Sequence, residues 1–471
     1  MELTQSQHNH SGAIVILLLV FCGFTVMDIV DAVWFNHGGD LSNSRSRSIE
    51  EPLINPLLIS KLRLKWKFFT GDDTTATPAV AHGVVYFPSW NGYLYAVNAF
   101  SGALVWRQHL GELTGLSPAG VVVNVTVSRT TPVIAGHLLI IGIYGPAVVV
   151  AINRFSGALV WSTVLDTRPR SQITTGFYVG VSSLEVTLPA EQCCTFRGSM
   201  AKLDIRTGAV LWRTYTIPDN AGKLGRNLVY IGTGNLYNAP AEVQQCQANR
   251  NNQTIPSQPD QCIAPDVHFD SILALELDSG KIRWFRQFGG YDVFYFVCLV
   301  PNNPASPMLL TIFPSGTRRD VVVAVQKSGF AWALDRDTGD IVWFNWGAAT
   351  DGKRVYTNIV NNAGVRFRLA PSNQTTTFGA WVALDANTGE IVWSTANPSN
   401  ETAHGPVTVT NGVVLLETGT IIWTYNTNAT VYGGASVSYG CVYLGHGYSV
   451  NLARFHPTWT RGNSVFAFCT V

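Results

Sequence analysis

The chain has 471 residues, of which 46% are hydrophobic, 11% aromatic and only 13% charged. Its 43 glycines and 22 prolines favour short strands and frequent turns over long helices, so the composition predicts an all-β protein. The 31 basic and 30 acidic side chains give a net charge of +1 and form no long runs, which excludes an electrostatic surface for nucleic acid or for an anionic membrane.

The N-terminal region contains an apolar run of 15 residues, from 13 to 27. A helix that spans a bilayer needs about 20 apolar residues, so this run suits a secretory signal peptide better. The small residues around Ala32 provide a cleavage point, and we expect residues 1–32 to direct the protein out of the cell. An uncleaved anchor is the alternative, because no Lys or Arg precedes the run.

Sequons and cysteines agree with an oxidising compartment. The Asn-x-Ser/Thr sequons that follow the N-terminal run lie at Asn124, Asn252, Asn373, Asn400 and Asn428. Cys246 and Cys262 bracket a polar loop, and we expect a disulfide between them that stabilises the fold by roughly 3 kcal/mol in the chain-entropy model. Cys298, Cys441 and Cys469 have no partner that the sequence identifies.

A repeat organises the rest of the chain: a turn glycine is followed four residues later by tryptophan. Each full copy, such as LYAVNAFSGALVW or WVALDANTGEIVW, predicts a strand, a turn that needs positive φ, and a second strand that ends on tryptophan. The pairs are Gly102/Trp106, Gly157/Trp161, Gly208/Trp212, Gly280/Trp284, Gly339/Trp343, Gly389/Trp393 and, in a shortened copy, Gly419/Trp423.

Two more strand-like runs precede several copies, so one unit holds about four strands. Such units predict the blades of a β-propeller, with the tryptophans packed between neighbouring blades. No set of three strands precedes the strand of Trp66, and no tryptophan strand follows the C-terminal run NSVFAFCTV. We therefore expect these two ends to pair and to close a ring of eight blades, with seven as the alternative. The expected domains are the signal peptide at 1–32, an N-terminal segment at 33–65 and the propeller at 66–471.

Two interruptions of the repeat predict incomplete blades. Gly389 and Gly419 are only 30 residues apart, which is too short for four strands and their connections. After Trp212 the chain has no counterpart of the first strand of a blade. We therefore expect at least two blades to lack strands.

The repeat A-x-D-x-x-T-G-x-x-x-W resembles that of pyrroloquinoline-quinone (PQQ) enzymes over nearly the whole mature chain. The segment WFNHGGDLSNSR at 34–45 resembles the opening of quinoprotein alcohol dehydrogenases, and QCCTFRGSMAKLD and YIGTGNLY resemble the polyvinyl-alcohol dehydrogenase branch, especially its plant-type secreted members. The resemblance implies PQQ held with Ca²⁺ on the propeller axis and the oxidation of an alcohol. No Cys-x-x-Cys-His haem motif occurs, so an external electron acceptor is needed.

The resemblance also implies roles for single residues. Asp292 in QFGGYDVFYF matches the catalytic aspartate, the base that removes a proton while the alcohol passes hydride to the quinone. Glu185 and Asn235 match the Ca²⁺ ligands, and both offer the oxygen donors that this ion requires. An ordinary turn or surface role is the alternative for all three residues.

Further positions match cofactor contacts. Lys327 in QKSG matches the cation that contacts the quinone oxygens. Arg129 in VSRTTP and Asn358 in VYTN match two further residues that contact the cofactor. For all three residues the alternative is an ordinary ion pair or a strand-end hydrogen bond. The adjacent Cys193 and Cys194 match a vicinal disulfide that packs on the cofactor in some quinoproteins, with separate thiols or separate bridges as the alternative.

Two functions from different classes remain open. The first is a secreted PQQ- and Ca²⁺-dependent dehydrogenase of small or polymeric alcohols. The second is a non-catalytic secreted propeller that binds a glycan or a component of the extracellular matrix or wall, favoured by the missing strands and by the loss of the family's stacking tryptophan between Asn220 and Asn227. The absence of Gly-x-Ser-x-Gly, His-Glu-x-x-His and P-loop motifs argues against other enzyme classes.

Overall fold

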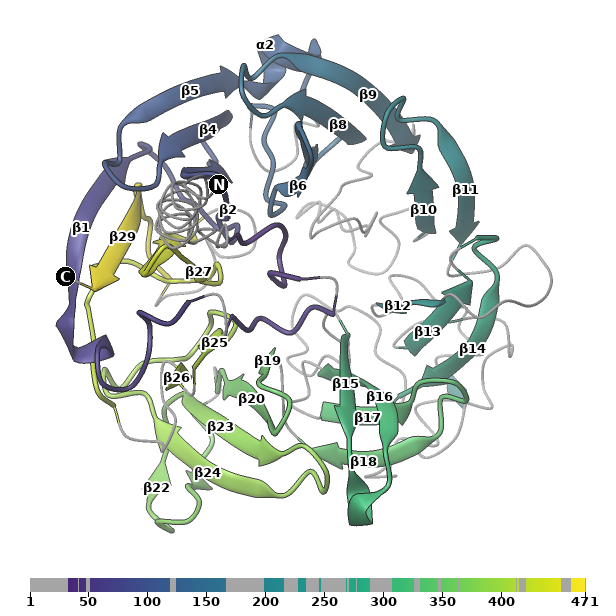
Figure 1. The fold of residues 1–471 in the computed structure, drawn as a ribbon, viewed down its shortest axis with the longest axis vertical. Coiled ribbons are helices and arrows are strands. Elements are labelled where there is room, and N and C mark those ends of the chain that lie inside the picture. The colour runs from purple at the N-terminus through teal and green to yellow at the C-terminus, as the bar shows by residue number, and fades with distance from the viewer. Residues whose placement is uncertain are drawn as a thin grey trace, which may run out of the picture.

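In a computed structural model of the chain, β-sheets are arranged as a ring around one axis (Figure 1). The structure describes residues 33–40, 42–47, 51–118, 124–166, 199–215, 228–233, 245–246, 268, 271–276, 278–288, 307–325, 331–345, 349–361, 364–411, 413–414, 421–449 and 459–470. Within these residues, five sheets have four strands, one has three and three have two.

The strands of each sheet are antiparallel to their neighbours. Two four-stranded sheets follow each other directly in the chain; in hydrogen-bonded order they are β2 (Ala79–Ala81), β3 (Val84–Pro88), β4 (Tyr93–Asn98) and β5 (Leu104–His109), then β6 (Val133–Ala135), β7 (Leu138–Gly142), β8 (Ala147–Asn153) and β9 (Leu159–Asp166). Two more lie in the second half of the chain: β15 (Met308–Ile312), β16 (Arg319–Val325), β17 (Ala331–Asp335) and β18 (Ile341–Asn345), then β19 (Ala349–Thr350), β20 (Arg354–Ile359), β23 (Ala380–Asp385) and β24 (Ile391–Ala396). The fifth combines strands from both ends of the chain, in the order β1 (Leu62–Phe69), β29 (Ser464–Thr470), β28 (Cys441–Gly445) and β27 (Ser436–Ser438). The three-stranded sheet comprises β12 (Leu228–Gly232), β13 (Ser271–Glu276) and β14 (Ile282–Gln287).

Short elements complete the description. The two-stranded pairs are β10 (Ser199–Leu203) with β11 (Val210–Tyr215), β25 (Val409–Thr410) with β26 (Val413–Val414), and β21 (Phe367–Arg368) with β22 (Thr375–Thr376). In the part of the chain that the structure describes, short helices include η1 (Ile59–Lys61), α2 (Leu110–Thr114) and η2 (Pro314–Gly316). Among the residues described, no helix combines the length and the apolar character needed to cross a bilayer.

The all-β propeller predicted from the repeat is confirmed, but the count of eight blades is not. Six sheets of three or four strands form blades in the described part of the ring, with the inner strands, such as β2 and β6, near the axis and the outer strands, such as β5 and β9, at the rim (Figure 1). The pairs β10–β11 and β25–β26 lie between these blades (Figure 1). The three-stranded sheet follows Trp212 in the chain, where the sequence predicts a missing strand.

The two ends of the propeller share one sheet. Strand β1 pairs with β29, and Trp66 lies opposite Ala467, so the N-terminal strand forms the rim of the C-terminal blade. A disulfide joins Cys441 of β28 to Cys469 of β29, which face each other across the pair. Cys246 is also disulfide-bonded, while its expected partner Cys262 lies outside the described residues.

The predicted packing of tryptophan between blades is confirmed, and the turn glycine explains it. The turn glycine of one blade lies against the tryptophan of the neighbouring blade that precedes it along the chain. A Cβ atom at this glycine would lie only 2.5 to 2.8 Å from that tryptophan; the glycines with such a contact are Gly102, Gly208, Gly280, Gly339 and Gly389. Each of these has φ between 72° and 78°, which L side chains rarely adopt. The indole nitrogen also donates to a backbone oxygen of the same turn, as in Trp66 to Ala99 at 2.9 Å.

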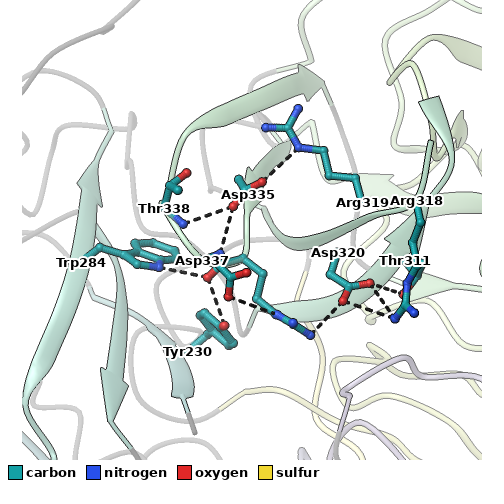
Figure 2. Close-up of polar contacts among 10 residues, drawn as sticks. Tyr230, Trp284, Thr311, Arg318, Arg319, Asp320, Asp335, Asp337 and Thr338 are labelled. Carbon is teal, nitrogen blue, oxygen red and sulfur yellow. Dashed lines mark hydrogen bonds and ion pairs between the residues drawn. The ribbon is translucent and has the colours of Figure 1, made fainter. Parts of the chain in front are cut away.

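One of these contacts is reinforced by an ion pair. The backbone oxygen of Arg336 accepts hydrogen bonds from Trp284 Nε1 at 3.0 Å and from the Tyr230 hydroxyl at 3.1 Å (Figure 2). The Arg336 guanidinium in turn pairs with Asp320 at 3.1 Å. A hydrogen bond from Thr311, together with nearby arginines, keeps the pKa of Asp320 below its ordinary value, so this carboxylate stays ionised.

The N-terminal segment crosses the centre of the ring (Figure 1). Its backbone exchanges two hydrogen bonds between Trp34 and Val80, at 2.8 and 3.0 Å. Further along, its oxygens accept hydrogen bonds from the inner edges of other sheets; the donors are the N–H groups of Ile134, Leu309, Thr350 and Val409. Residues 34–47 therefore join the inner strands of sheets that are far apart in the sequence.

The glycine contact can be tested with a matched pair of variants. Gly339→Ala places a methyl group 2.7 Å from the Trp284 ring, whereas Gly316→Ala meets no atom within 4 Å, and both glycines have φ near +80° (75° and 80°). Overpacking costs about 1–3 kcal/mol, so G339A should lose that much more unfolding free energy than G316A. Chemical denaturation followed by circular dichroism measures both, and equal losses would show that the indole contact does not stabilise the ring.

Candidate functional site

The connections at one end of the ring converge on its axis. Because neighbouring strands are antiparallel, a connection from a rim strand to the next inner strand emerges at the same end as a connection between the second and third strands of a blade. Arg129 follows β5, Tyr144 lies between β7 and β8, Tyr432 precedes β27, and Tyr448 lies between β28 and β29. All four residues are therefore carried to this one end.

Arg129 is enclosed by aromatic rings. Its guanidinium carbon lies 5.6 Å from the centre of the Tyr144 ring and 5.9 Å from that of Tyr432, and it has a side-chain hydrogen bond with Tyr432. Such cation–π contacts stabilise a cation away from bulk water. Burial lowers the pKa of Arg129, but Tyr448, Tyr432 and Tyr144 outweigh this and raise it overall, so the side chain remains a cation. In the described residues, no carboxylate pairs with it.

A row of rings extends from this cation. The ring of Tyr432 lies 4.0 Å from that of Tyr448, which lies 5.1 Å from the ring of Trp459. The interplanar angles are 30° and 33°, so the three rings are inclined to one another rather than perpendicular. We call Tyr432, Tyr448 and Trp459 the C-terminal wall of the Arg129 site.

The C-terminal wall ends at a histidine. Trp459 Nε1 donates to His404 Nε2 at 2.7 Å, and because an indole nitrogen only donates, His404 Nε2 accepts and the neutral ring carries its proton on Nδ1. Asn358, at the end of β20, donates from its side chain to the backbone oxygen of Ala403, next to His404. The predicted cofactor contacts Arg129 and Asn358 are thus connected through this row.

A second wall lies on the other side of Arg129. The Trp90 ring packs against Tyr144 in an edge-to-face arrangement, with 5.3 Å between centroids. Trp90 Nε1 donates to Thr75 Oγ1 at 2.9 Å, and the Tyr144 N–H donates to the oxygen of Val127 at 2.8 Å. We call Trp90 and Tyr144 the N-terminal wall.

Arg45 anchors the axial segment close to this site. Only 2% of Arg45 is exposed, and its guanidinium donates to backbone oxygens of Val407 at 2.8 Å, of Ala435 at 3.2 Å and of His37. Burial lowers the pKa of Arg45 to about 10. His37 Nδ1 lies 3.3 Å from Thr131 Oγ1, two residues beyond Arg129, so the segment contacts the loop of the enclosed cation.

His37 makes stability depend on pH. Burial, and then the charge of Arg45, lower the pKa of His37 to about 3. The folded state therefore binds fewer protons than the unfolded state below pH 6.5, and stability is lost as the pH falls from there toward 3. At pH 5 the cost is about 1–2 kcal/mol.

His37→Asn keeps a polar group near Thr131 but cannot become charged. We expect the unfolding free energy of H37N to fall less than that of the wild type between pH 7 and pH 5, because the proton uptake by unfolded His37 is removed. Urea denaturation at a series of pH values measures the difference. Parallel curves for the two proteins would show that His37 is not the titrating group.

The structure describes two of the residues to which the sequence assigns a role. Arg129 and Asn358 lie at the site, whereas the remaining residues lie outside the described part of the chain; they are Glu185, Cys193, Cys194, Asn235, Asp292 and Lys327. Among the residues described, no group of three His, Cys, Asp or Glu side chains could hold a metal ion. The aromatic walls were not foreseen from the sequence, because their residues lie in connections between strands and follow no repeat.

Comparisons with known proteins agree with the propeller. The model of a PQQ-type repeat family, described as outer membrane protein assembly factor BamB, matches residues 59–345 and 333–432. Polyvinylalcohol dehydrogenase of Sphingopyxis sp. (strain 113P3) is 26% identical over 90% of this chain and 74% of its own, and that of Pseudomonas sp. is 25% identical over 88% and 73%. The crystal structure of quinohemoprotein alcohol dehydrogenase from Comamonas testosteroni superposes with a TM-score of 0.65 and 16% identity, covering 93% of this chain and 80% of that one.

Proposed function

The chain belongs to the PQQ-repeat family of β-propellers, and we propose that it is an oxidoreductase of the quinoprotein alcohol dehydrogenase type. The two relatives named polyvinylalcohol dehydrogenase match 90% and 88% of the chain, which supports this reaction class. The substrate is then an alcohol, small or polymeric, and the electrons pass to an external acceptor.

The enclosed Arg129 carries this proposal. A half-buried cation between aromatic rings, with no carboxylate partner in the described residues, favours a flat anionic ligand that stacks on rings and neutralises the charge. PQQ is a flat aromatic carboxylate, so the residues present fit it. When bound, PQQ supplies the two-electron acceptor for alcohol oxidation.

The remaining roles extend the same proposal. Arg129 binds a carboxylate of the cofactor, and Lys327 and Asn358 contact its other polar groups. Asp292 holds the proton that leaves the alcohol hydroxyl. Ca²⁺ is held by oxygen atoms of Glu185 and Asn235. Cys193 and Cys194 would form the vicinal disulfide that packs on the cofactor.

Secretion is part of the proposal. Residues 1–32 act as the signal peptide, and sequons are glycosylated in the secretory route. The asparagines of the sequons in the described residues are solvent-exposed, which supports their modification; they are Asn124, Asn373, Asn400 and Asn428. The fifth sequon, at Asn252, lies outside the described part.

We also propose that the ring has eight blades. The pair β10–β11 makes the contact between turn glycine and tryptophan on both of its sides. Its Gly208 lies against Trp161 of the preceding blade, and Gly280 of the next blade lies against its Trp212. The pair β25–β26 lies between β24 and β27 in the chain. These two pairs then represent the seventh and eighth blades.

Cofactor affinity tests the role of Arg129. The mature protein is titrated with PQQ in the presence of Ca²⁺ and followed by quinone absorbance and tryptophan quenching. Loss of a charge-assisted hydrogen bond costs about 1.5–3 kcal/mol, so Arg129→Gln should weaken binding by roughly tenfold or more. The control is Arg283→Gln, at an exposed position of rim strand β14. Absence of micromolar binding by the wild type, or unchanged binding by R129Q, would contradict the proposal.

Turnover tests Asp292 separately. Reduction of an artificial dye is measured with simple primary and secondary alcohols and with short vinyl alcohol oligomers. Asp292→Asn removes the proton acceptor but keeps the shape of the side chain, so dye reduction should disappear while PQQ affinity is retained. Unchanged turnover would remove Asp292 from its assigned role.

A further inference from the structure

We propose that Asp73 is the positioning residue that holds both aromatic walls of the Arg129 site. The inference rests on the proposed function for the identity of the ligand, but its structural part concerns only residues of this chain. Asp73 lies between β1 and β2 and has 0% of its surface exposed.

The carboxylate of Asp73 binds both ends of the connection between β28 and β29. Its Oδ2 accepts hydrogen bonds from the N–H of Ser449 at 2.7 Å and from the Ser449 hydroxyl at 2.9 Å. Its Oδ1 accepts one from the N–H of Gly462 at 2.7 Å. Tyr448 precedes Ser449, and Trp459 lies three residues before Gly462, so the carboxylate is bonded next to two members of the C-terminal wall.

Close packing leaves the carboxylate little freedom. A Cβ atom at Gly447 would lie 2.1 Å from Asp73 Oδ1 and 2.4 Å from the nitrogen of Gly462, so only glycine is accommodated there. Gly447 also has φ of 102°, which L side chains rarely adopt. The two glycines bring the ends of the connection against one carboxylate, and a longer acid at position 73 would collide with them.

The backbone of Asp73 holds the other wall. Its carbonyl oxygen accepts hydrogen bonds from the N–H of Trp90 at 2.9 Å and from the hydroxyl of Ser89 at 3.1 Å. Trp90 packs on Tyr144, whose ring faces Arg129. The side chain of Asp73 thus supports the C-terminal wall and its main chain supports the N-terminal wall.

Through these hydrogen bonds, Asp73 orients the aromatic rings around Arg129, which is a different role from stabilising the fold as a whole. If the carboxylate is lost, Tyr448 and Trp459 lose the hydrogen bonds that fix the ends of their connection, and Tyr432 loses the ring that packs on it. Arg129 then becomes more accessible and less well oriented. A residue that only stabilised the fold would lower the melting temperature without changing the environment of Arg129.

The test compares Asp73→Asn with Asp72→Asn. D73N keeps the shape of the side chain but turns an N–H₂ group toward one set of N–H donors, which breaks part of the contact. Asp72 is the matched control, because D72N removes the charge that faces the exposed Arg461 at 3.2 Å, while the amide oxygen of Asn can still accept the 2.8 Å hydrogen bond that Asp72 Oδ1 receives from the Asp73 N–H. Ser449→Ala, which removes only one hydroxyl, is the milder variant to be used if D73N does not fold.

Two readouts need no cofactor. Hydrogen exchange should become about tenfold faster or more at the amides of Ser449 and Gly462 in D73N, and less so in S449A. Modification of Arg129 by phenylglyoxal, located by mass spectrometry, should become several-fold faster in D73N and remain as in the wild type in D72N. Unchanged exchange, or faster exchange with unchanged Arg129 reactivity, would overturn the proposal.

A third readout is PQQ affinity. We expect D73N to weaken binding by about tenfold, the effect typical of residues that orient a binding group, and D72N to bind as the wild type does. If the wild type does not bind PQQ, the proposed function is wrong, while exchange and Arg129 reactivity still decide the role of Asp73. If the wild type and D73N bind equally well, the role in ligand binding is wrong although the proposed function stands.

Discussion

The ring depends on a contact that repeats between neighbouring blades, in which an indole lies on the turn glycine of the next sheet. At Gly208 and Gly280 a Cβ atom would lie only 2.5 Å from the ring, so glycine allows the tryptophan to reach the backbone. The indole N–H donates to the same turn, as from Trp161 to Ile205 at 3.0 Å. This combination sets both the spacing and the rotation between sheets. The connections at the ends of the blades, including that of Arg129, take their positions from it.

The repeat made this part of the fold predictable from the sequence. The period from glycine to tryptophan is local, so it can be identified without knowing which blades are neighbours, and the unpaired strand of Trp66 indicates where the ring closes. The disulfide between Cys441 and Cys469 was not predictable, because 28 residues separate them and only the register of β28 on β29 places them opposite each other. The blade count also required knowledge of which strands pair.

The candidate site was less accessible to sequence reasoning. The sequence assigns Arg129 and Asn358 to the site only through resemblance to a family, not through a pattern of their own. The rings around Arg129 come from segments about 300 residues apart in the chain, such as those of Tyr144 and Tyr432, and no periodicity links them. A buried acid such as Asp73 has no sequence signal either, because its partners Ser449 and Gly462 are defined only by the closed ring.

The axial segment has a consequence for the order of folding. Trp34 pairs with Val80, which is synthesised soon after it, but Arg45 needs the backbone oxygens of Val407 and Ala435. Strand β1 likewise finds its partner only in β29. During synthesis both segments stay without these partners until almost the whole chain has emerged. A chain that ends before residue 407 would leave the buried guanidinium of Arg45 and the edge of β1 without these partners together, whereas one that ends between residues 436 and 463 would leave only the edge of β1 unpaired, so the two contacts report on different stages of ring closure.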